Sequence, residues 1–470
     1  MHWDPIAQLA KDNRQGKRKV SDLVWDCLRQ IKKADNYHAI LETSPTAHEY
    51  ARELDKIPVK DRKGKLFGVP FIVKDNFLTT NTHTTAGSNI LKPFRAPYQA
   101  TAVERLEAEG AIMVAKSNLD AFAHGSSTEN SDFGPTKNPR NLAYVPGGSS
   151  GGSAAAIALG QAAFALGTDT GGSIRLPASF SGVVGLKVTY GLVSRYGVIA
   201  MASSTDTIGP LTRSVDDAAL VLDVMSGQDE HDGTSIPRDG SGYQRLSANL
   251  KGKRVAVIKE HFGPGVDPNV ANRIKEVVST MEAAGAIVTE VSIPIDELAL
   301  AVYYILVPAE VSSNLARYDG IKYGFSAKQA GSLVELYERS RAEGFGDEAK
   351  RRIMVGTYVL SSGYYDAYYK KAQAVRTILI EEYQKAFAQA DILVGPTAPT
   401  LPFKLGARRD PLSMYLTDVL TVAANLVGNP AISVPVGMVD GLPVGMQLSA
   451  PQRAERTLLG VARAVEGLVK

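Results

Sequence analysis

Short apolar runs alternate with amphipathic segments along most of the chain. Residues 100–110 place apolar side chains at helical spacing with glutamates on the opposite side, and residues 269–284 repeat this pattern up to Gly285. Such spacing predicts amphipathic helices, the second one ended by a glycine cap. The Ala-rich segment 153–166 predicts a buried helix of small residues. The short apolar runs predict buried strands at 68–73, 111–115, 254–259, 287–291, 431–436 and 444–448, with another run ending at Val394.

This alternation predicts the α/β class, with a mixed β-sheet core covered by helices on both sides. Residues 297–390 are mostly helical and rich in tyrosine, and they predict a helical insertion packed on the sheet. We interpret its tyrosines as packing residues rather than as a platform for stacked bases. No repeat or low-complexity linker interrupts the chain. We therefore expect one domain over 1–470, with a core at about 65–240 and C-terminal strands and a helix at 391–470.

The composition is that of a globular protein with a large core. Hydrophobic residues make up 44% of the 470 positions and charged residues 21%, which is ordinary globular usage. Lys plus Arg number 52 and Asp plus Glu number 49, so the formal net charge is only +3. A charge this close to balance gives no electrostatic footprint for binding nucleic acid or a membrane. Cys27 is the sole cysteine, which excludes an internal disulfide and a Cys-rich metal site.

The first residues, M-H-W-D-P, carry no apolar segment of the kind that secretory signals need. The longest apolar stretch, 153–167, is shorter than the ~20 residues of a helix that spans a bilayer. We therefore expect a cytoplasmic protein without a membrane segment.

Serine and glycine concentrate in two neighbouring runs, P-G-G-S-S-G-G-S at 146–153 and G-T-D-T-G-G-S-I-R at 167–175. Glycine lets the backbone approach a ligand closely, and such loops cradle phosphates or build oxyanion holes. Phosphate binding is not supported, because neither a P-loop motif nor a dinucleotide-binding glycine motif occurs. The seven histidines are scattered without metal-ligand spacing, so no metal site is expected. The two runs therefore point to a serine nucleophile.

A serine hydroxyl needs a base to become a nucleophile. One candidate base is a histidine, because residues 147–151 match G-x-S-x-G. The loop-like residues before Ser149 argue against the strand that this nucleophile elbow requires. The other candidate is Lys74, which ends the apolar run 69–73. Burial at a strand end favours the neutral amine, which can accept a serine proton. The alternative for Lys74 is a structural lysine paired with a carboxylate such as Asp75.

Three segments together resemble the amidase signature family. They are G-V-P-F-I-V-K-D at 68–75, G-G-S-S-G-G at 147–152 and the run at 167–175. The joint pattern is far more specific than any single piece. The resemblance implies the fold of that family and an amidase activity based on a Ser–cis-Ser–Lys triad.

Carried over by position, the resemblance implies that Ser173 is the nucleophile, Ser149 the bridging serine and Lys74 the base. The tetrahedral oxyanion would need hydrogen-bond donors, which backbone N–H groups of the second glycine run can supply. The residues implied for this oxyanion hole are Thr170, Gly171 and Gly172.

Further segments resemble one branch of the family, the glutaminase subunits of tRNA-dependent amidotransferases. These segments are 122–131, 314–320, 350–354, 360–369 and 414–420. The resemblance implies that the chain hydrolyses glutamine and supplies ammonia for converting Glu-tRNA(Gln) to Gln-tRNA(Gln). It implies B and C subunits as partners in a heterotrimer, with tRNA reached only through the B subunit. It implies no cofactor in this chain, since ATP and Mg would bind the partner subunit.

A free amino acid as substrate needs a partner for each of its charges. The resemblance implies Arg352 for the α-carboxylate and Asp418 for the α-ammonium, with Tyr304 nearby. Arg351 is the competing choice, because the adjacent pair leaves an ambiguity of one residue. Either arginine could instead be a charge on a helix surface.

Two positions depart from the family pattern. Val188 stands where proline is usual, and His124 stands where methionine is common. The first is a turn position, whereas the second can affect the substrate pocket. A free-standing amidase acting on small amides is the main alternative function, and its pocket would not need the pair Arg352 and Asp418. A catalytically silent binding protein and an α/β-hydrolase esterase are further alternatives.

Overall fold

A single mixed β-sheet runs through the computed structural model, which describes residues 3–240, 242–244, 246–408 and 410–469. The strands are β1 (Ile40–Thr43), β2 (Pro70–Lys74), β3 (Ile112–Ser117), β4 (Phe164–Asp169), β5 (Val184–Lys187), β6 (Thr207–Thr212), β7 (Arg254–Ile258), β8 (Ile287–Val291), β9 (Ile392–Pro396), β10 (Ala431–Val439) and β11 (Leu442–Ser449). Within the described residues they form one 11-stranded sheet in the order β1-β3-β2-β4-β6-β5-β10-β11-β9-β7-β8. Strand β2 is parallel to β3 and β4, and β7 to β8 and β9, while the other neighbours are antiparallel. The predicted α/β class and mixed sheet are confirmed.

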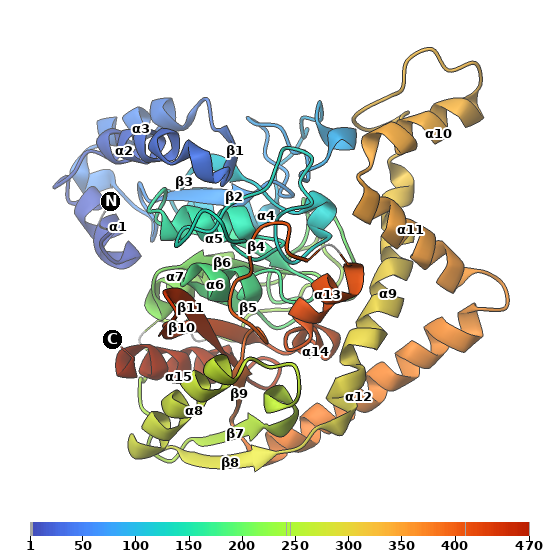
Figure 1. Ribbon diagram of the computed structural model, residues 1–470. Helices are drawn as coiled ribbons and strands as arrows, with labels where there is room; N and C mark the ends of the chain where they lie inside the picture. The colour runs from blue at the N-terminus through green and yellow to red at the C-terminus, as the bar shows by residue number, and fades with distance from the viewer. Residues whose placement is uncertain (1–2, 241, 245, 409, 470) are drawn as a thin grey trace.

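Helices surround this sheet (Figure 1). The helices are α1 (Ile6–Arg14), α2 (Val20–Lys33), α3 (Ala47–Lys56), α4 (Thr101–Ala108), α5 (Gly151–Ala158), α6 (Arg175–Ser181), α7 (Val215–Met225), α8 (Pro268–Ala283), α9 (Ala299–Asn314), α10 (Leu333–Gly344), α11 (Asp347–Leu360), α12 (Lys371–Gln389), α13 (Pro411–Tyr415), α14 (Val422–Leu426) and α15 (Glu455–Leu468). Local signals set several of their ends. The Ser214 hydroxyl accepts the Asp217 N–H at the start of α7, and Gly285, with φ +97°, follows the end of α8.

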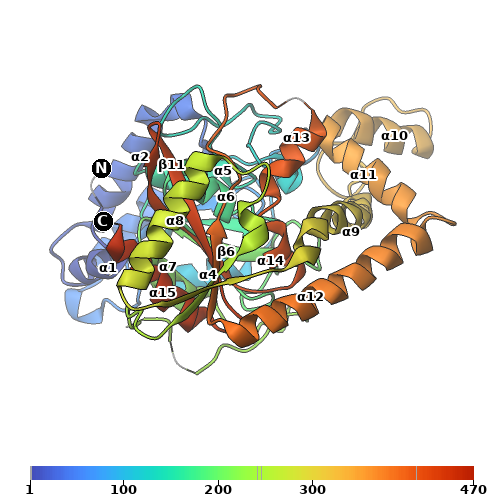
Figure 2. The same ribbon diagram turned by 60° about the horizontal axis from the view of Figure 1, so that its bottom comes forward.

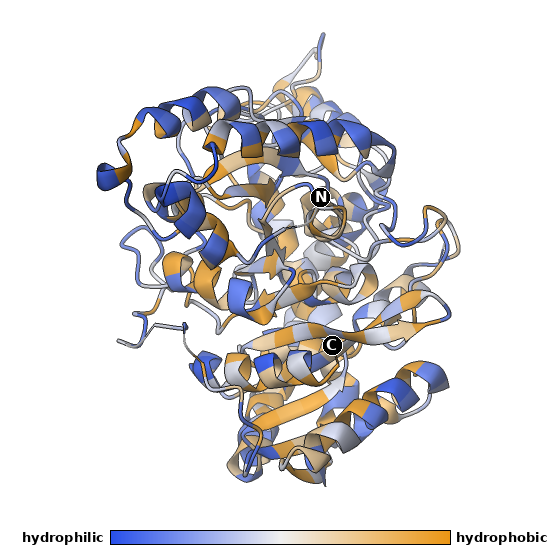
Figure 3. Ribbon diagram, turned by 90° about the vertical axis from the view of Figure 1, so that its left-hand side faces the viewer, coloured by the Kyte–Doolittle hydropathy of each residue, from blue (hydrophilic) through white to orange (hydrophobic). Residues whose placement is uncertain are grey.

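Alternate residues of the central strands pack against helices on opposite faces of the sheet. Phe71 and Val73 of β2 share a core with residues of α4, α7, α8 and α15, whereas Ile72 packs with α2, α3, α5 and α6. This follows from the two-residue period of a strand. Figure 3 shows the strands mainly in the hydrophobic colour and the outer helices largely hydrophilic. Burial of each large side chain here contributes about 1.5–3 kcal/mol.

The prediction of one helix over 153–166 is wrong for the second half of that segment. Helix α5 ends at Ala158, and Gly160, with φ +72°, turns the chain into strand β4. Strand β4 pairs with β2 and β6, and the Phe164 ring stacks on Phe71 at 5.2 Å between centroids. Pairing in the middle of the sheet therefore overrides the helical propensity of the Ala-rich segment. Strands β1, β5 and β6 were likewise not predicted.

Helices α9 to α12 form a layer beside the sheet (Figures 1 and 2). Helix α11 lies directly on α9, because a Cβ on Gly356 would come within 1.8 Å of the Pro308 carbonyl oxygen. The tyrosines of the following π-helix, Tyr365–Lys370, contact one another: Tyr365 and Tyr369 stack at 5.2 Å. Tyr365 is 39% exposed, so this cluster packs on itself more than on the sheet.

One helical stretch, Pro294–Arg317, is long and apolar enough to cross a membrane by length and composition alone, and it is the only one in the described ranges. It includes α9 and lies outside the apolar stretch 153–167. Half of its most apolar window is buried inside the molecule, where α9 contacts α11, α12 and α14. Core helices of globular proteins meet the same criteria.

Candidate active site

Lys74 ends strand β2 in the middle of the sheet and has no exposed surface. Its Nζ donates to Ser149 Oγ at 2.7 Å and to Thr168 Oγ1 at 2.9 Å. Burial lowers the pKa of Lys74 to about 7, although Asp120, Asp169 and Asp206 partly oppose this. Near neutral pH a large fraction of the amine is therefore uncharged and can accept a proton.

Ser149 lies in the glycine run that precedes α5, and the peptide bond before it is cis. Two residues of this run have to be glycines, because other atoms of the protein approach their Cα atoms too closely for a side chain. A Cβ on Gly148 would lie 2.2 Å from Asp120 Oδ2, and one on Gly147 would lie 2.7 Å from Pro177 Cα. The nearest preceding strand, β3, ends at Ser117, so Ser149 does not sit on the strand-to-helix elbow of an α/β-hydrolase.

Ser173 lies in the loop between β4 and α6 and is only 8% exposed. The Ser150 N–H donates to the Ser173 carbonyl at 3.1 Å, so the two serine-bearing loops are directly joined. The Asp169 carboxylate shapes the second loop by accepting from Gly172 N–H at 2.8 Å and from the Arg175 guanidinium at 3.0 Å. Burial would raise the pKa of Asp169, but Arg175 and other donors hold it at about 2. This buried ion pair fixes the loop that carries Ser173.

The backbone proposed for an oxyanion hole is held from several sides. Thr170 Oγ1 donates to Asp206 at 2.7 Å, and Thr421 Oγ1 donates to the Gly171 carbonyl at 2.6 Å. Gly172 has φ +136°, and a Cβ there would lie 2.2 Å from Thr421 Oγ1. The Gly172 N–H is already paired with Asp169. Among the described residues, no acceptor pairs with the N–H groups of Thr170, Gly171 or Ser173.

Asp418 and Arg352 are both buried and lie close enough for their charges to interact. Asp418 accepts from Ser126 Oγ at 2.5 Å, and burial raises its pKa to about 7 despite that bond and the Arg352 charge. The Arg352 guanidinium lies 5.3 Å above the Tyr304 ring and donates from Nε to Glu348 at 2.8 Å. Neither Nη nitrogen of Arg352 has an acceptor in the described part of the chain.

The two candidate arginines have different surroundings. Arg352 is 3% exposed, whereas Arg351 is on the outside of α11 and pairs with Glu348 there. The Tyr304 hydroxyl is buried without a partner among the described residues. The Tyr303 ring contacts Tyr304 and lies against Gly171, where a Cβ would come within 2.7 Å. The tyrosines beside Arg352 therefore border the loop of Ser173.

The two departures from the family pattern have different environments. Val188 follows β5 and is buried in the main core, where its carbonyl accepts from Lys187 Nζ at 3.1 Å. His124 is fully buried, and the Arg352 charge acts on its ring. The valine is therefore structural, whereas the histidine is buried within reach of the Arg352 charge.

Several residues of the site were not identified from the sequence. Thr168, Asp169 and Arg175 lie inside the recognised motif 167–175, so their presence was visible but their roles were not. Ser126 and Glu348 contribute single side chains from distant segments. Only the folded chain brings these two beside Asp418 and Arg352.

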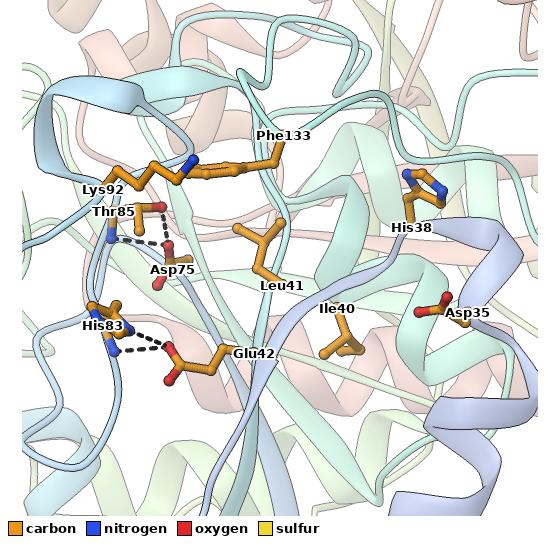
Figure 4. Close-up of a pocket in the computed structure, with 10 residues that line it drawn as sticks. All are labelled: Asp35, His38, Ile40, Leu41, Glu42, Asp75, His83, Thr85, Lys92 and Phe133. Atoms are coloured by element: carbon orange, nitrogen blue, oxygen red, sulfur yellow. Dashed lines mark hydrogen bonds and ion pairs between the residues drawn. The ribbon is translucent and has the colours of Figure 1, made fainter. Parts of the chain in front are cut away.

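A separate cavity of about 560 Å³ lies beside Asp75, the residue that follows Lys74 (Figure 4). Its lining includes Asp75, whose carboxylate bonds Thr85 and pairs with the buried Lys116 at 2.8 Å. Glu42 and His83 contact each other at its edge. None of Lys74, Ser149 or Ser173 lines this cavity. Lys116, not Lys74, is thus the lysine paired with Asp75. Among the described residues, no cluster of His, Cys, Asp or Glu could hold a metal ion.

Comparisons with known proteins agree on one family. The amidase family model matches residues 22–459. The A subunit of glutamyl-tRNA(Gln) amidotransferase from Exiguobacterium sibiricum is 51% identical over 456 residues, which cover 96% of this chain and 95% of that protein. The corresponding protein from Bacillus licheniformis is 50% identical over 466 residues, covering 98% and 96%.

Solved structures show the same fold. The crystal structure of the A subunit of glutamyl-tRNA(Gln) amidotransferase from Thermotoga maritima matches with a TM-score of 0.81 at 40% identity, covering 96% of this chain and 91% of that one. The peptide amidase of Stenotrophomonas maltophilia matches with a TM-score of 0.85 at 31% identity, covering 99% and 96%. With the family model spanning nearly the whole sequence, this chain belongs to the amidase family, the family that its serine, glycine and lysine motifs indicate.

Proposed function

We propose that this chain is the glutaminase subunit of a tRNA-dependent amidotransferase. The observation that carries the proposal is the buried hydrogen bond from Lys74 to Ser149, beside the loop of Ser173. Full-length relatives at 50–51% identity bear the name of the A subunit of such an enzyme. An amide-cleaving centre in a relative of this kind fits the release of ammonia from glutamine.

In the proposed mechanism, neutral Lys74 takes a proton from Ser149 while Ser149 takes one from Ser173. The Ser173 oxygen then attacks the side-chain amide carbon of glutamine. Backbone N–H groups at Thr170, Gly171 and Gly172 are proposed to stabilise the oxyanion, and each such donor is worth ~3–4 kcal/mol in the barrier. The pairing of Gly172 N–H with Asp169 favours its neighbours as the main donors.

The tetrahedral intermediate then expels the leaving nitrogen. The Ser149 hydroxyl returns a proton to it, and Lys74 resupplies Ser149, so that ammonia departs and Ser173 carries a glutamyl ester. A water molecule attacks this ester and loses a proton through Ser149 to Lys74. The same proton returns through Ser149 to the Ser173 oxygen as the ester bond breaks and glutamate leaves. The pKa of Lys74, about 7, suits a group that must both accept and return a proton.

Arg352 and Asp418 are the proposed clamp for the charged end of glutamine. A guanidinium with both Nη nitrogens free can bind a carboxylate in a bidentate manner. A buried carboxylate such as Asp418 can bind the ammonium, and the Tyr304 hydroxyl adds a polar contact. Arg351 is less suited, because its side chain pairs with Glu348 at the surface.

The relatives' names imply partners. We propose that B and C subunits complete a heterotrimer in the cytoplasm, and that ATP and Mg bind the B subunit together with tRNA. The ammonia would be used there to convert Glu-tRNA(Gln) to Gln-tRNA(Gln).

A free-standing amidase is the alternative, favoured by the close structural match to a peptide amidase. The native mass of the tagged chain, purified from its own cells, separates the two. A stoichiometric complex with two other chains supports the amidotransferase, whereas a lone chain that hydrolyses simple amides supports the alternative.

Ser173→Ala tests the chemistry. It should abolish glutamine hydrolysis and the glutamyl ester that mass spectrometry detects on the Ser173 peptide. Ser226→Ala is the matched control, because that buried hydroxyl has no partner in the described ranges and is remote in sequence from both serine loops. Near-normal hydrolysis by Ser173→Ala would refute the assignment.

A further inference from the structure

The imidazole of His124 is buried with neither ring nitrogen paired. Its exposed fraction is 0%, and neither Nδ1 nor Nε2 has a hydrogen-bond partner among the described residues. Its backbone is held on both sides: the N–H donates to the Ala121 carbonyl at 3.0 Å, and the carbonyl accepts from Asn130 Nδ2 at 3.0 Å. Buried polar side chains normally have a partner. The missing partner of His124 is therefore expected to be a ligand.

The loop before His124 is shaped to place this ring. Phe122 and Ala123 both have left-handed backbone conformations, with φ of 53° and 63°, which non-glycine residues adopt at a cost. The Phe122 ring packs against Tyr318 at 5.3 Å and Phe345 at 5.5 Å, which secures the turn. Such strained conformations cluster at functional sites.

The surroundings of His124 are those of the proposed amino-acid clamp. Burial, aided by the positive charge of Arg352, lowers the pKa of His124 well below its usual value. The ring is therefore neutral, with one N–H donor and one acceptor nitrogen. Two residues further along, Ser126 bonds Asp418. His124 is thus close to the cation and, through its own loop, to the carboxylate that would hold glutamine.

We propose that His124 is a specificity-determining residue that donates a hydrogen bond from its neutral imidazole to the substrate carboxylate held by Arg352. This inference rests on the proposed function and adds a third group to the clamp. A methionine at this position would have no N–H to donate. The histidine should therefore favour substrates that carry a carboxylate over otherwise identical amides.

The test compares glutamine with 4-aminobutanamide, which keeps the amine and the amide but lacks the carboxylate. In the complex as purified, His124→Met should raise KM for glutamine about tenfold and leave kcat/KM for 4-aminobutanamide within about twofold. His124→Asn places an N–H near the position of Nδ1, and His124→Gln places one near that of Nε2. If one of these two variants restores the KM for glutamine, it identifies the ring nitrogen of His124 that donates the hydrogen bond. His48→Met, on α3, is the matched control and should change neither the KM for glutamine nor the kcat/KM for 4-aminobutanamide.

An unchanged KM for glutamine in His124→Met overturns the inference, and so do equal losses on both substrates. Thermal unfolding shows whether each variant folds, and the Asn and Gln variants carry the comparison if the Met variant does not. The wild-type complex keeps the two hypotheses apart. If it hydrolyses glutamine while His124→Met behaves normally, only the role of His124 fails. If it does not hydrolyse glutamine, the proposed function fails as well.

Discussion

The proposed catalytic base and the side chains proposed to bind substrate satisfy their polar groups in opposite ways. Lys74 Nζ, although fully buried, finds two partners within the protein through its bonds to Ser149 and Thr168. The His124 ring nitrogens and the Tyr304 hydroxyl are also buried, and they have no partner among the described residues. The bonds of Lys74 fix the position of its amine before the substrate arrives, as a preorganised catalytic group requires. The unpaired groups of His124 and Tyr304 remain free to form hydrogen bonds with a ligand, as a binding site requires.

The difference follows from where each region lies in the fold. Lys74 and Asp169 end adjacent parallel strands, β2 and β4, in the middle of the sheet. The pocket is assembled from α9, α11 and two loops that are far apart in sequence. The sheet thus supplies rigidity to the proposed catalytic centre, and helices α9 and α11 carry side chains proposed to bind the substrate.

Removing the amine of Lys74 should have the largest effect and tests the difference between the two regions most strongly. Lys74→Met should lower kcat for glutamine by roughly 10³-fold or more, since a general base contributes ~10²–10⁴-fold and the bridging serine loses its proton acceptor as well. The loss of its bonds to Ser149 and Thr168 should lower stability by about 1–3 kcal/mol, which thermal unfolding checks.

Lys187→Met is the matched control for Lys74→Met. Lys187 is also buried with a pKa lowered by burial to about 7, but its Nζ donates to the carbonyls of Val188 and Asn429. Its loss should cost about 1–3 kcal/mol of stability and leave kcat nearly intact. If both variants lose activity equally, Lys74 has no special role as a base.

The pH dependence separates the two regions. Below about 7, Lys74 is protonated and cannot act as a base, and Asp418, whose pKa burial raises to about 7, is neutral and cannot hold an ammonium. Both effects are relieved as the pH rises. The kcat/KM for glutamine should therefore increase through pH 7 with a limiting logarithmic slope near two.

Asp418→Asn should reduce this slope to about one and raise KM for glutamine roughly 100-fold, as expected for removing one partner of a buried charge pair. The pH profiles of kcat and kcat/KM, measured for both forms of the complex, provide the check. A slope that stays near two in the variant would place the second proton elsewhere.

The smallest predicted effect concerns the unpaired hydroxyl of Tyr304. Tyr304→Phe should raise KM for glutamine about 3–10-fold, because a substrate contact is lost. The free protein should unfold at the same or a slightly higher temperature, because an unpaired buried hydroxyl is removed. In Tyr383→Phe, which loses a bond to Asp296 of 3.0 Å, stability should fall while KM stays constant. The reverse pattern would mean that Tyr304 is structural.

The sequence predicts the catalytic centre better than the pocket. Lys74, Ser149 and Ser173 lie in compact motifs, and their glycines are required by close backbone approaches such as that of Gly148 to Asp120. The strand ends that position them follow from short apolar runs. By contrast, the Ala-rich segment 153–166 was predicted as one helix, because its propensity does not reveal the pairing of β4.

The pocket was harder to predict because its contacts are tertiary. Nothing in the sequence around Glu348 indicates that it pairs with both arginines and with the Tyr415 hydroxyl. Adjacent arginines look alike in sequence, and only the orientation of α11 separates the buried Arg352 from the exposed Arg351. The missing partners of His124 are a property of the folded state alone.

The contact of Gly356 with the Pro308 carbonyl has a consequence for how the enzyme can respond to its substrate. Because no side chain separates the two helices there, α9 and α11 cannot slide or part without opening a void. Tyr304 on one and Arg352 on the other are therefore a preassembled half of the proposed binding surface, in place before the substrate arrives. The entropy cost of ordering the Tyr304 and Arg352 side chains is therefore incurred during folding and not during binding. We expect any adjustment to the incoming amino acid on the opposite side, where Ser126 lies on a loop and Asp418 ends a short 3-10 helix.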